Sequence, residues 1–243
     1  MKPLGQKSYG SIPHLIGSRV GPSDHHASEG QCRIATERTR DKHDLIIVQE
    51  KLDGGNVGVA KVRGEIVALT RSGYLAETSP YRTHFAFAEY VRQNEKRFTG
   101  LLKEGERVCG EWLYTAVGTK YDLPHEPFVP FDLMTGTDRL IFSDFVKRIK
   151  AFDFAPPQVL SIGQPLTIEA AMILCDVSAH GAIEEVEGAI WRVERKGKVD
   201  FLCKYVKPSK VDGRYLKEDV FNGLPAGFEY LYETFTNCNP VLK

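Results

Sequence analysis

The stretch Glu50-Lys51-Leu52-Asp53-Gly54-Gly55-Asn56 decides how this chain is interpreted. It follows the apolar run Leu45-Ile46-Ile47-Val48, which predicts a buried strand that ends in a tight glycine turn. Lys51 is therefore expected where a strand brings a side chain to the rim of a sheet. A lysine held there can act as a nucleophile if its surroundings lower its pKa. A solvated lysine before a turn would give the same short pattern.

Composition describes an ordinary globular chain that is long enough for one large domain. It has 243 residues, of which 42% are hydrophobic and 26% charged, with a formal net charge of zero. No apolar stretch approaches the roughly 20 residues that a membrane span requires, and residues 1–7 lack the apolar core of a signal peptide. The five cysteines have no C-x-x-C spacing, which predicts reduced thiols in a cytoplasmic protein.

Positive charge is concentrated between Arg192 and Lys217, where nine basic residues stand against three acidic ones. A run of this kind is commonly a solvated face. It also suits a wall that binds the phosphates of a nucleotide or of a nucleic-acid backbone.

Hairpins with interspersed helices predict an α+β protein with antiparallel sheets. Strands are expected at 45–50, 56–62, 65–70, 107–115, 128–134, 187–194 and 198–205. Helices are expected at 81–98, 138–150 and 167–177, with one or two short ones within 216–236. Asp138 and Thr167 are the expected N-caps of two of these helices. Residues 1–44 are predicted to be loop with short elements, anchored by Ile12, Leu15 and Ile16.

Five further segments carry polar or aromatic side chains on predicted strands or at their ends. They are Thr70-Arg71-Ser72-Gly73-Tyr74, the strand with Glu111, the strand with Phe131-Asp132, the strand start Glu187-Gly188, and the strand end with Lys204 and Lys207. In isolation each has an ordinary alternative, such as a solvated arginine, a sheet-edge glutamate or a core phenylalanine.

The ordered set resembles the covalent nucleotidyltransferase superfamily, which contains ATP-dependent RNA and DNA ligases and mRNA capping enzymes. Lys51-Leu52-Asp53-Gly54 is similar to the nucleophile motif of that superfamily. The later motifs are matched in order by Arg71-Ser72-Gly73, Glu111, Phe131-Asp132, Glu187-Gly188 and Lys204. The form of the first motif, with Glu50 and Asn56, is similar to RNA ligases, and so is the segment 9–15.

The resemblance implies two mainly antiparallel sheets flanked by helices, and a reaction in two nucleotidyl transfers. The Lys51 amine would attack the α-phosphorus of ATP, so that AMP becomes bound to Lys51 and pyrophosphate leaves. The AMP would then pass to an RNA 5′-phosphate, and a 3′-hydroxyl would displace it. The implied cofactors are ATP and Mg²⁺ or Mn²⁺. The implied partners are RNA ends and an end-healing kinase or phosphatase.

The resemblance also assigns roles to single residues. Lys51, Lys204 and Glu187 would be catalytic, and Glu187 and Asp53 would contact the metal ion. Glu111 would accept a ribose hydroxyl, Phe131 would stack on adenine and Arg71 would hold a ribose or phosphate. The other expected nucleotide contacts are Glu50, Asn56, Lys204 and Lys207. A free lysine has a pKa of roughly 10.4, which Lys204, Lys207 and a bound metal ion would lower at Lys51.

The chain departs from the superfamily pattern in its last motif and in its length. Two lysines separated by one residue are usual there, whereas two residues separate Lys204 from Lys207. We expect a single domain over 1–243, with 1–44 packed on it as an extension and no C-terminal OB-fold domain. RNA would then be held by the extension, by the basic stretch 192–217 or by a partner.

Three alternatives remain open at this point: a DNA-nick ligase, a GTP-dependent capping enzyme, and a non-catalytic module that binds nucleotides or RNA ends.

Overall fold

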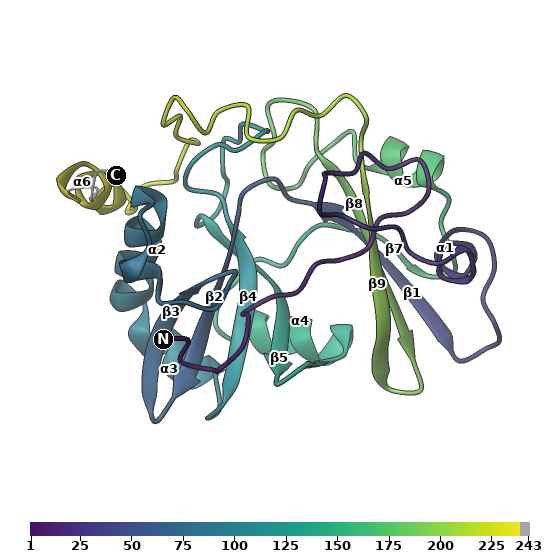
Figure 1. Ribbon diagram of the computed structural model, residues 1–243, viewed down its shortest axis with the longest axis horizontal. Coiled ribbons are helices and arrows are strands. Elements are labelled where there is room, and N and C mark those ends of the chain that lie inside the picture. The colour runs from purple at the N-terminus through teal and green to yellow at the C-terminus, as the bar shows by residue number, and fades with distance from the viewer. Residues whose placement is uncertain (239–243) are drawn as a thin grey trace.

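The computed structural model describes residues 1–238 and shows an α+β protein with two antiparallel sheets flanked by helices (Figure 1). The predicted fold class is confirmed. The four-stranded sheet has the order β7 (Val159–Gly163), β1 (Asp44–Lys51), β8 (Gly188–Arg195) and β9 (Lys198–Val206). The five-stranded sheet has the order β3 (Glu65–Thr70), β2 (Gly55–Val62), β4 (Glu106–Trp112), β5 (Phe128–Thr135) and β6 (Asp138–Arg139).

The glycine turn after Lys51 carries the chain from one sheet to the other. β1 belongs to the four-stranded sheet and ends at Lys51, while β2 begins the next hairpin at Gly55 in the five-stranded sheet. Gly54 approaches β4 so closely that a Cβ there would lie 2.7 Å from the carbonyl oxygen of Trp112. Only glycine fits this crossing without displacing backbone, and the crossing places Lys51 between the two sheets.

Helices cover one face of each sheet. α2 (Arg82–Gln93), α3 (Glu95–Leu101), α4 (Phe142–Lys150) and α6 (Tyr230–Asn237) pack with the five-stranded sheet around an aromatic core that includes Phe87, Tyr90 and Phe128. α1 (Glu29–Thr36) and α5 (Ile168–Leu174) pack on the four-stranded sheet around Trp191. A 3₁₀ turn, η1, spans Ala76–Thr78. Within residues 1–238, no helix combines the length and the apolar character that a bilayer crossing demands.

The helix predicted at 81–98 is two helices that meet at Asn94. The Asn94 side chain donates to the carbonyl oxygen of Tyr90 at 2.9 Å, and the Asn94 backbone N–H donates to the same oxygen at 3.1 Å. The predicted helix start at Asp138 is wrong, because Asp138 pairs with Thr135 in the β5–β6 hairpin. α4 begins at Phe142, whose N–H donates to Glu194 on β8 at 2.6 Å. The Thr167 N-cap of α5 is confirmed, and the edge strand β7 was not predicted.

The N-terminal segment forms an additional partner for the edge strand β9. The Lys204 N–H donates to the Pro13 carbonyl at 2.9 Å, and the Leu15 N–H donates to the Lys204 carbonyl at 2.8 Å. In Figure 1 this segment, drawn in purple, passes from the five-stranded sheet to β9 and so bridges the two sheets. Leu15 is buried as predicted, whereas Ile16 is 61% exposed and anchors nothing.

Candidate active site

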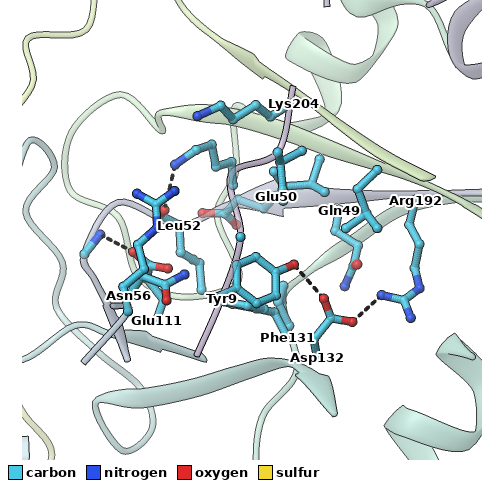
Figure 2. A pocket seen from close by; sticks show the side chains of 18 residues that line it. Tyr9, Gln49, Glu50, Leu52, Asn56, Glu111, Phe131, Asp132, Arg192 and Lys204 are labelled. Atoms are coloured by element: carbon cyan, nitrogen blue, oxygen red, sulfur yellow. Dashed lines mark hydrogen bonds and ion pairs between the residues drawn. The ribbon is translucent and has the colours of Figure 1, made fainter. Parts of the chain in front are cut away.

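A cavity of about 310 Å³ opens between the two sheets and the N-terminal segment (Figure 2). Its lining joins residues that are far apart in the sequence, among them Tyr9, Lys51, Asn56, Glu111, Phe131 and Lys204. The volume lies at the lower end of the range for small-molecule sites. The cavity is therefore the candidate site, and most of the residues singled out from the sequence meet in it.

Lys51 stands at the end of β1, opposite Gly188 of β8. Its ammonium donates to the carboxylate of Glu187, the residue that precedes β8. Burial lowers the pKa of Lys51, but the carboxylates of Glu187 and Glu111 raise it by more, so the pKa lies above the usual lysine value. The expectation that Lys204 and Lys207 lower the pKa of Lys51 is therefore not met by the side chains of the protein alone.

Lys204 reaches the cavity from β9. Lys204 pairs with Ile190 of β8, and Ile190 pairs with Gln49 of β1, so these three residues share one face of the sheet. Burial and the nearby Lys51 ammonium lower the pKa of Lys204. Figure 2 shows the Lys204 side chain at the upper rim of the site.

Glu111 and Asp53 fix the glycine turn from two sides. Glu111 on β4 accepts from the Gly54 N–H at 3.2 Å. Burial raises the pKa of Glu111 to about 7, and the Glu187 carboxylate adds to that rise. Asp53 accepts from the Thr119 hydroxyl at 3.1 Å and lies 3.8 Å from Lys210. The Asp53 side chain therefore packs behind the turn and is not part of the cavity lining.

The opposite wall of the cavity is aromatic. Phe131 of β5 meets Tyr9 of the N-terminal segment edge-on, with ring centroids 4.9 Å apart. Tyr9 belongs to the segment 9–15 that is similar to RNA ligases, but the sequence predicted no role for Tyr9 itself. Its hydroxyl donates to Asp132 at 2.6 Å, and Arg192 of β8 donates to the other oxygen of Asp132 at 2.6 Å. Figure 2 shows this Tyr9–Asp132–Arg192 chain at one end of the cavity.

Three polar atoms on residues that line the cavity are buried and have no partner within residues 1–238. They are Nε2 of Gln49, Oε2 of Glu50 and Oδ1 of Asn56. Such atoms cost free energy unless a ligand or water satisfies them. Oε1 of Glu50 accepts from the Ser178 hydroxyl at 2.7 Å, and burial raises the pKa of Glu50 to about 7. A ligand that carries both donors and acceptors fits this wall.

The basic stretch 192–217 is not an open phosphate wall, because most of its cations are already paired. Lys207 lies 3.2 Å from Glu185, and Arg195 lies within 2.8 Å of Asp41 and of Asp44. Arg192 and Lys210 are both buried. The Lys210 ammonium donates to the carbonyl oxygens of Gly118 and Glu185 and to the hydroxyl of Thr119. Lys207 is outside the cavity lining, and its contact with a nucleotide stays a prediction.

A second cavity of about 410 Å³ adjoins the first and shares Tyr9, Asn56 and Arg71 with it. Its remaining lining residues are Lys7, Ser11, Thr70, Ser72 and His84. The Arg71 guanidinium donates to the Ser11 hydroxyl at 3.1 Å. Neither Arg71 nor Lys7 has a carboxylate within ion-pair distance in the described part of the chain. These two cations are available to an anion.

The carboxylates around Lys51 fit a magnesium or manganese ion that is completed by other ligands. Residues 1–238 contain no cluster of three or more acidic, histidine or cysteine side chains with metal-binding geometry. Mg²⁺ is commonly held by one or two carboxylates together with substrate phosphates and water. Burial, and after it the neighbouring carboxylates, raises the pKa values of Glu187 and Glu111, and the charge of a divalent cation would oppose both effects.

Lys51 stands at a strand rim and lines a small-molecule cavity between two antiparallel sheets, as the resemblance to covalent nucleotidyltransferases implies. The sequence profile of the RNA ligase family matches residues 44–206, more than half of the chain. The chain therefore belongs to the RNA ligase family. No curated protein matches it.

Solved structures of ligases share the fold. A mutant of Naegleria gruberi RNA ligase with ATP and Mn is 16% identical, with a TM-score of 0.56 over 80% of this chain and 59% of its own. A putative ATP-dependent DNA ligase from Aquifex aeolicus is 16% identical, with a TM-score of 0.50 over 82% of this chain and 49% of its own. An archaeal ATP-dependent RNA ligase is 18% identical, with a TM-score of 0.47 over 82% and 48%. The chain thus spans about half the length of these relatives.

Proposed function

We propose that this protein is an ATP-dependent RNA ligase that joins 5′-phosphate and 3′-hydroxyl RNA ends through a lysyl-AMP on Lys51. One observation carries the proposal. The predicted nucleophile stands in a cavity of nucleotide size, paired with Glu187, and the same cavity holds Lys204, Glu111 and Phe131. Membership of the RNA ligase family and the fold shared with an RNA ligase that was solved with ATP and Mn support the same reaction.

In the proposed first step the neutral Lys51 amine attacks the α-phosphorus of ATP. A phosphorus–nitrogen bond forms, the bond to the bridging oxygen breaks, and pyrophosphate leaves with that electron pair. The nitrogen of Lys51 gives up one proton to the solvent. Lys204 and Arg71 supply positive charge at the rim, where negative charge builds up in the transition state. A bound Mg²⁺ or Mn²⁺ would supply further positive charge beside Glu187, with Asp53 behind it. Glu187 then no longer holds Lys51 in its protonated form.

The adenosine part of AMP is proposed to lie against Phe131 and the polar atoms that lack partners. The face of Phe131 suits stacking on any base. Glu50 and Gln49 offer an acceptor and a donor at the base edge, which suits the amino group and ring nitrogens of adenine. Glu111 is proposed to accept a ribose hydroxyl, and Asn56 and Lys207 are proposed as further nucleotide contacts.

Incubation with ATP labelled at the α-phosphate, followed by denaturing electrophoresis, tests the proposal. We expect a labelled protein band with magnesium or manganese and ATP, and no band with GTP. Protein first treated with pyrophosphate, which reverses any existing adenylation, is the starting material. Absence of a band over a range of metals and pH would reject the ligase and leave the non-catalytic nucleotide- or RNA-end-binding module. A band with GTP alone would point to the capping alternative.

The RNA end is proposed to enter by the second cavity, because Lys7 and Arg71 in its lining are available to an anion and because it shares Tyr9, Asn56 and Arg71 with the nucleotide cavity. Lys7→Ala is expected to raise the KM for a 5′-phosphorylated RNA by about three- to tenfold and to reduce the salt dependence of sealing. Adenylation should stay near the wild-type rate, because Lys7 is outside the nucleotide cavity. Lys198→Ala, on an exposed hairpin of β9, is the matched control.

Unchanged RNA affinity in Lys7→Ala would direct the search to another surface, and equal sealing of nicked DNA would favour the DNA-ligase alternative.

We further propose that residues 1–243 act as one domain, with 1–44 packed on it and no OB-fold domain within them. RNA breaks with other end groups would need an end-healing kinase or phosphatase. The five cysteines are free thiols and four of them are buried, which is consistent with the proposed cytoplasmic location.

A further inference from the structure

Lys204 is held in place by residues that lie outside the segment matched by the RNA ligase profile. Its backbone N–H and carbonyl are both bound by the N-terminal segment, at Pro13 and Leu15. Two residues further along β9, the Val206 carbonyl accepts from the Arg19 N–H at 3.0 Å. An isolated parallel bridge between His14 and Lys204 and the Arg19 bond therefore tie residues 13–19 to β9, and the position of Lys204 depends on these contacts.

Within residues 1–238, the one carboxylate that lies within ion-pair distance of the Lys204 side chain is Asp24, at 3.6 Å. Asp24 is itself held by the backbone, because its Oδ2 accepts from the Gly21 N–H at 3.0 Å. The same oxygen lies 3.2 Å from Nε2 of His14, which forms no hydrogen bond within residues 1–238. His14 is 1% exposed, and its Nδ1 is 2.7 Å from the Ser18 hydroxyl, which accepts from the Val206 N–H at 2.9 Å.

We infer that Asp24 is a positioning residue for Lys204, held by the Gly21 N–H beside the N-terminal segment that binds the Lys204 backbone. The inference rests on the proposed function, in which Lys204 stabilises charge at the α-phosphate. A lysine side chain has four rotatable carbons and no fixed direction of its own. Asp24 limits that freedom, because it is a carboxylate with a fixed place on the β9 side of the cavity.

The alternative attraction for Lys204 is Glu187, whose carboxylate also acts on the Lys204 ammonium. Glu187 is the partner of Lys51. Without the charge of Asp24, Lys204 would be drawn toward Glu187 and away from the place where the α-phosphate is proposed to bind. Asp24 thus keeps the two lysines of the site on separate carboxylates.

Asp24→Asn tests the inference, because asparagine has the same size and can still accept from Gly21 while it loses the charge. Single-turnover formation of lysyl-AMP is measured as a function of ATP concentration. We expect the maximal rate to fall about ten- to a hundredfold, the range for a displaced catalytic group, with the KM for ATP changed less than about threefold. Asp24→Glu should recover part of the rate. Asp200→Asn is the control. It removes the charge of a carboxylate that is paired with Arg40, and it is expected to leave the rate unchanged.

A double mutant separates positioning from a general loss of structure. If Asp24 acts through Lys204, adding Asp24→Asn to Lys204→Met should slow adenylation no further than Lys204→Met does alone. A wild-type rate in Asp24→Asn, or equal losses in both backgrounds, overturns the inference and leaves the proposed function standing. A wild-type protein that forms no adduct rejects the proposed function and the inference together.

Discussion

Lys51→Ala is expected to abolish the labelled adduct completely, while the protein stays folded and still binds ATP without reacting. The alanine removes the amine at the end of β1 that contacts Glu187. Lys204 cannot replace it, because Lys204 lies on β9, two strands away across the sheet, and is paired with Asp24. Loss of a nucleophile on which a covalent step depends removes the reaction itself, and not merely a fraction of its rate.

The measurement is the α-phosphate labelling assay, combined with calorimetric titration of ATP and a thermal unfolding curve. Most contacts of the cavity with a nucleotide come from residues other than Lys51, so binding should persist within about tenfold of wild type. Lys198→Ala is the control for removal of a lysine from the surface. An adduct that survives in Lys51→Ala, mapped to a different lysine by mass spectrometry, would contradict the assignment.

The strand that carries Lys51 could be predicted from the sequence because local patterns determine it. The apolar run 45–48 and the glycine pair fix the strand and its end without reference to the rest of the chain. The same is true of the hairpin turn at Lys196 and Gly197, both of which have positive φ. Glu111, Phe131 and Lys204, which were selected by the order of the motifs, line one cavity in the structure.

The N-terminal half of the site could not be predicted, because it is built from long-range contacts. Tyr9 contacts Asp132, which lies more than 120 residues later in the chain, and no local sequence pattern predicts such a pair. Arg192 was counted in a basic run, although it is buried in β8, lines the cavity and meets Asp132 there. The signal that was available is the position of Arg192 within a predicted strand, where alternate residues face inward.

The sequence led to the expectation that neighbouring lysines lower the pKa of Lys51, whereas in the structure its pKa is raised. The sequence shows how many lysines the motifs contain, but it does not show how far each lies from Lys51. In the structure Glu187 contacts the Lys51 ammonium directly, whereas Lys207 is turned to Glu185. Charge interactions weaken with distance, so the carboxylates dominate the pKa of Lys51.

Asp132→Ala is expected to destabilise the fold by about 3–5 kcal/mol, the cost of leaving a buried charge without its partner. Asp132 is fully buried and accepts from Tyr9, Arg139 and Arg192. Arg192 is 1% exposed, so water cannot replace the lost carboxylate. The chain would keep Glu194 as the other acidic partner of Arg192, which limits the loss.

Urea and thermal unfolding of the purified variant measure this effect, and a domain of this size should unfold roughly 6–20 °C lower. Asp138→Ala is the matched control, because Asp138 lies in the same hairpin but is exposed, and its loss should stay within about 0.5 kcal/mol. Replacing both charges, as Asp132→Leu with Arg192→Met, should cost less than Asp132→Ala alone, since no buried charge is then left unpaired. Equal stabilities of Asp132→Ala and Asp138→Ala would show that the Tyr9–Asp132–Arg192 chain does not hold the two sheets together. The N-terminal segment would then be held on the cavity by its backbone bonds to β9.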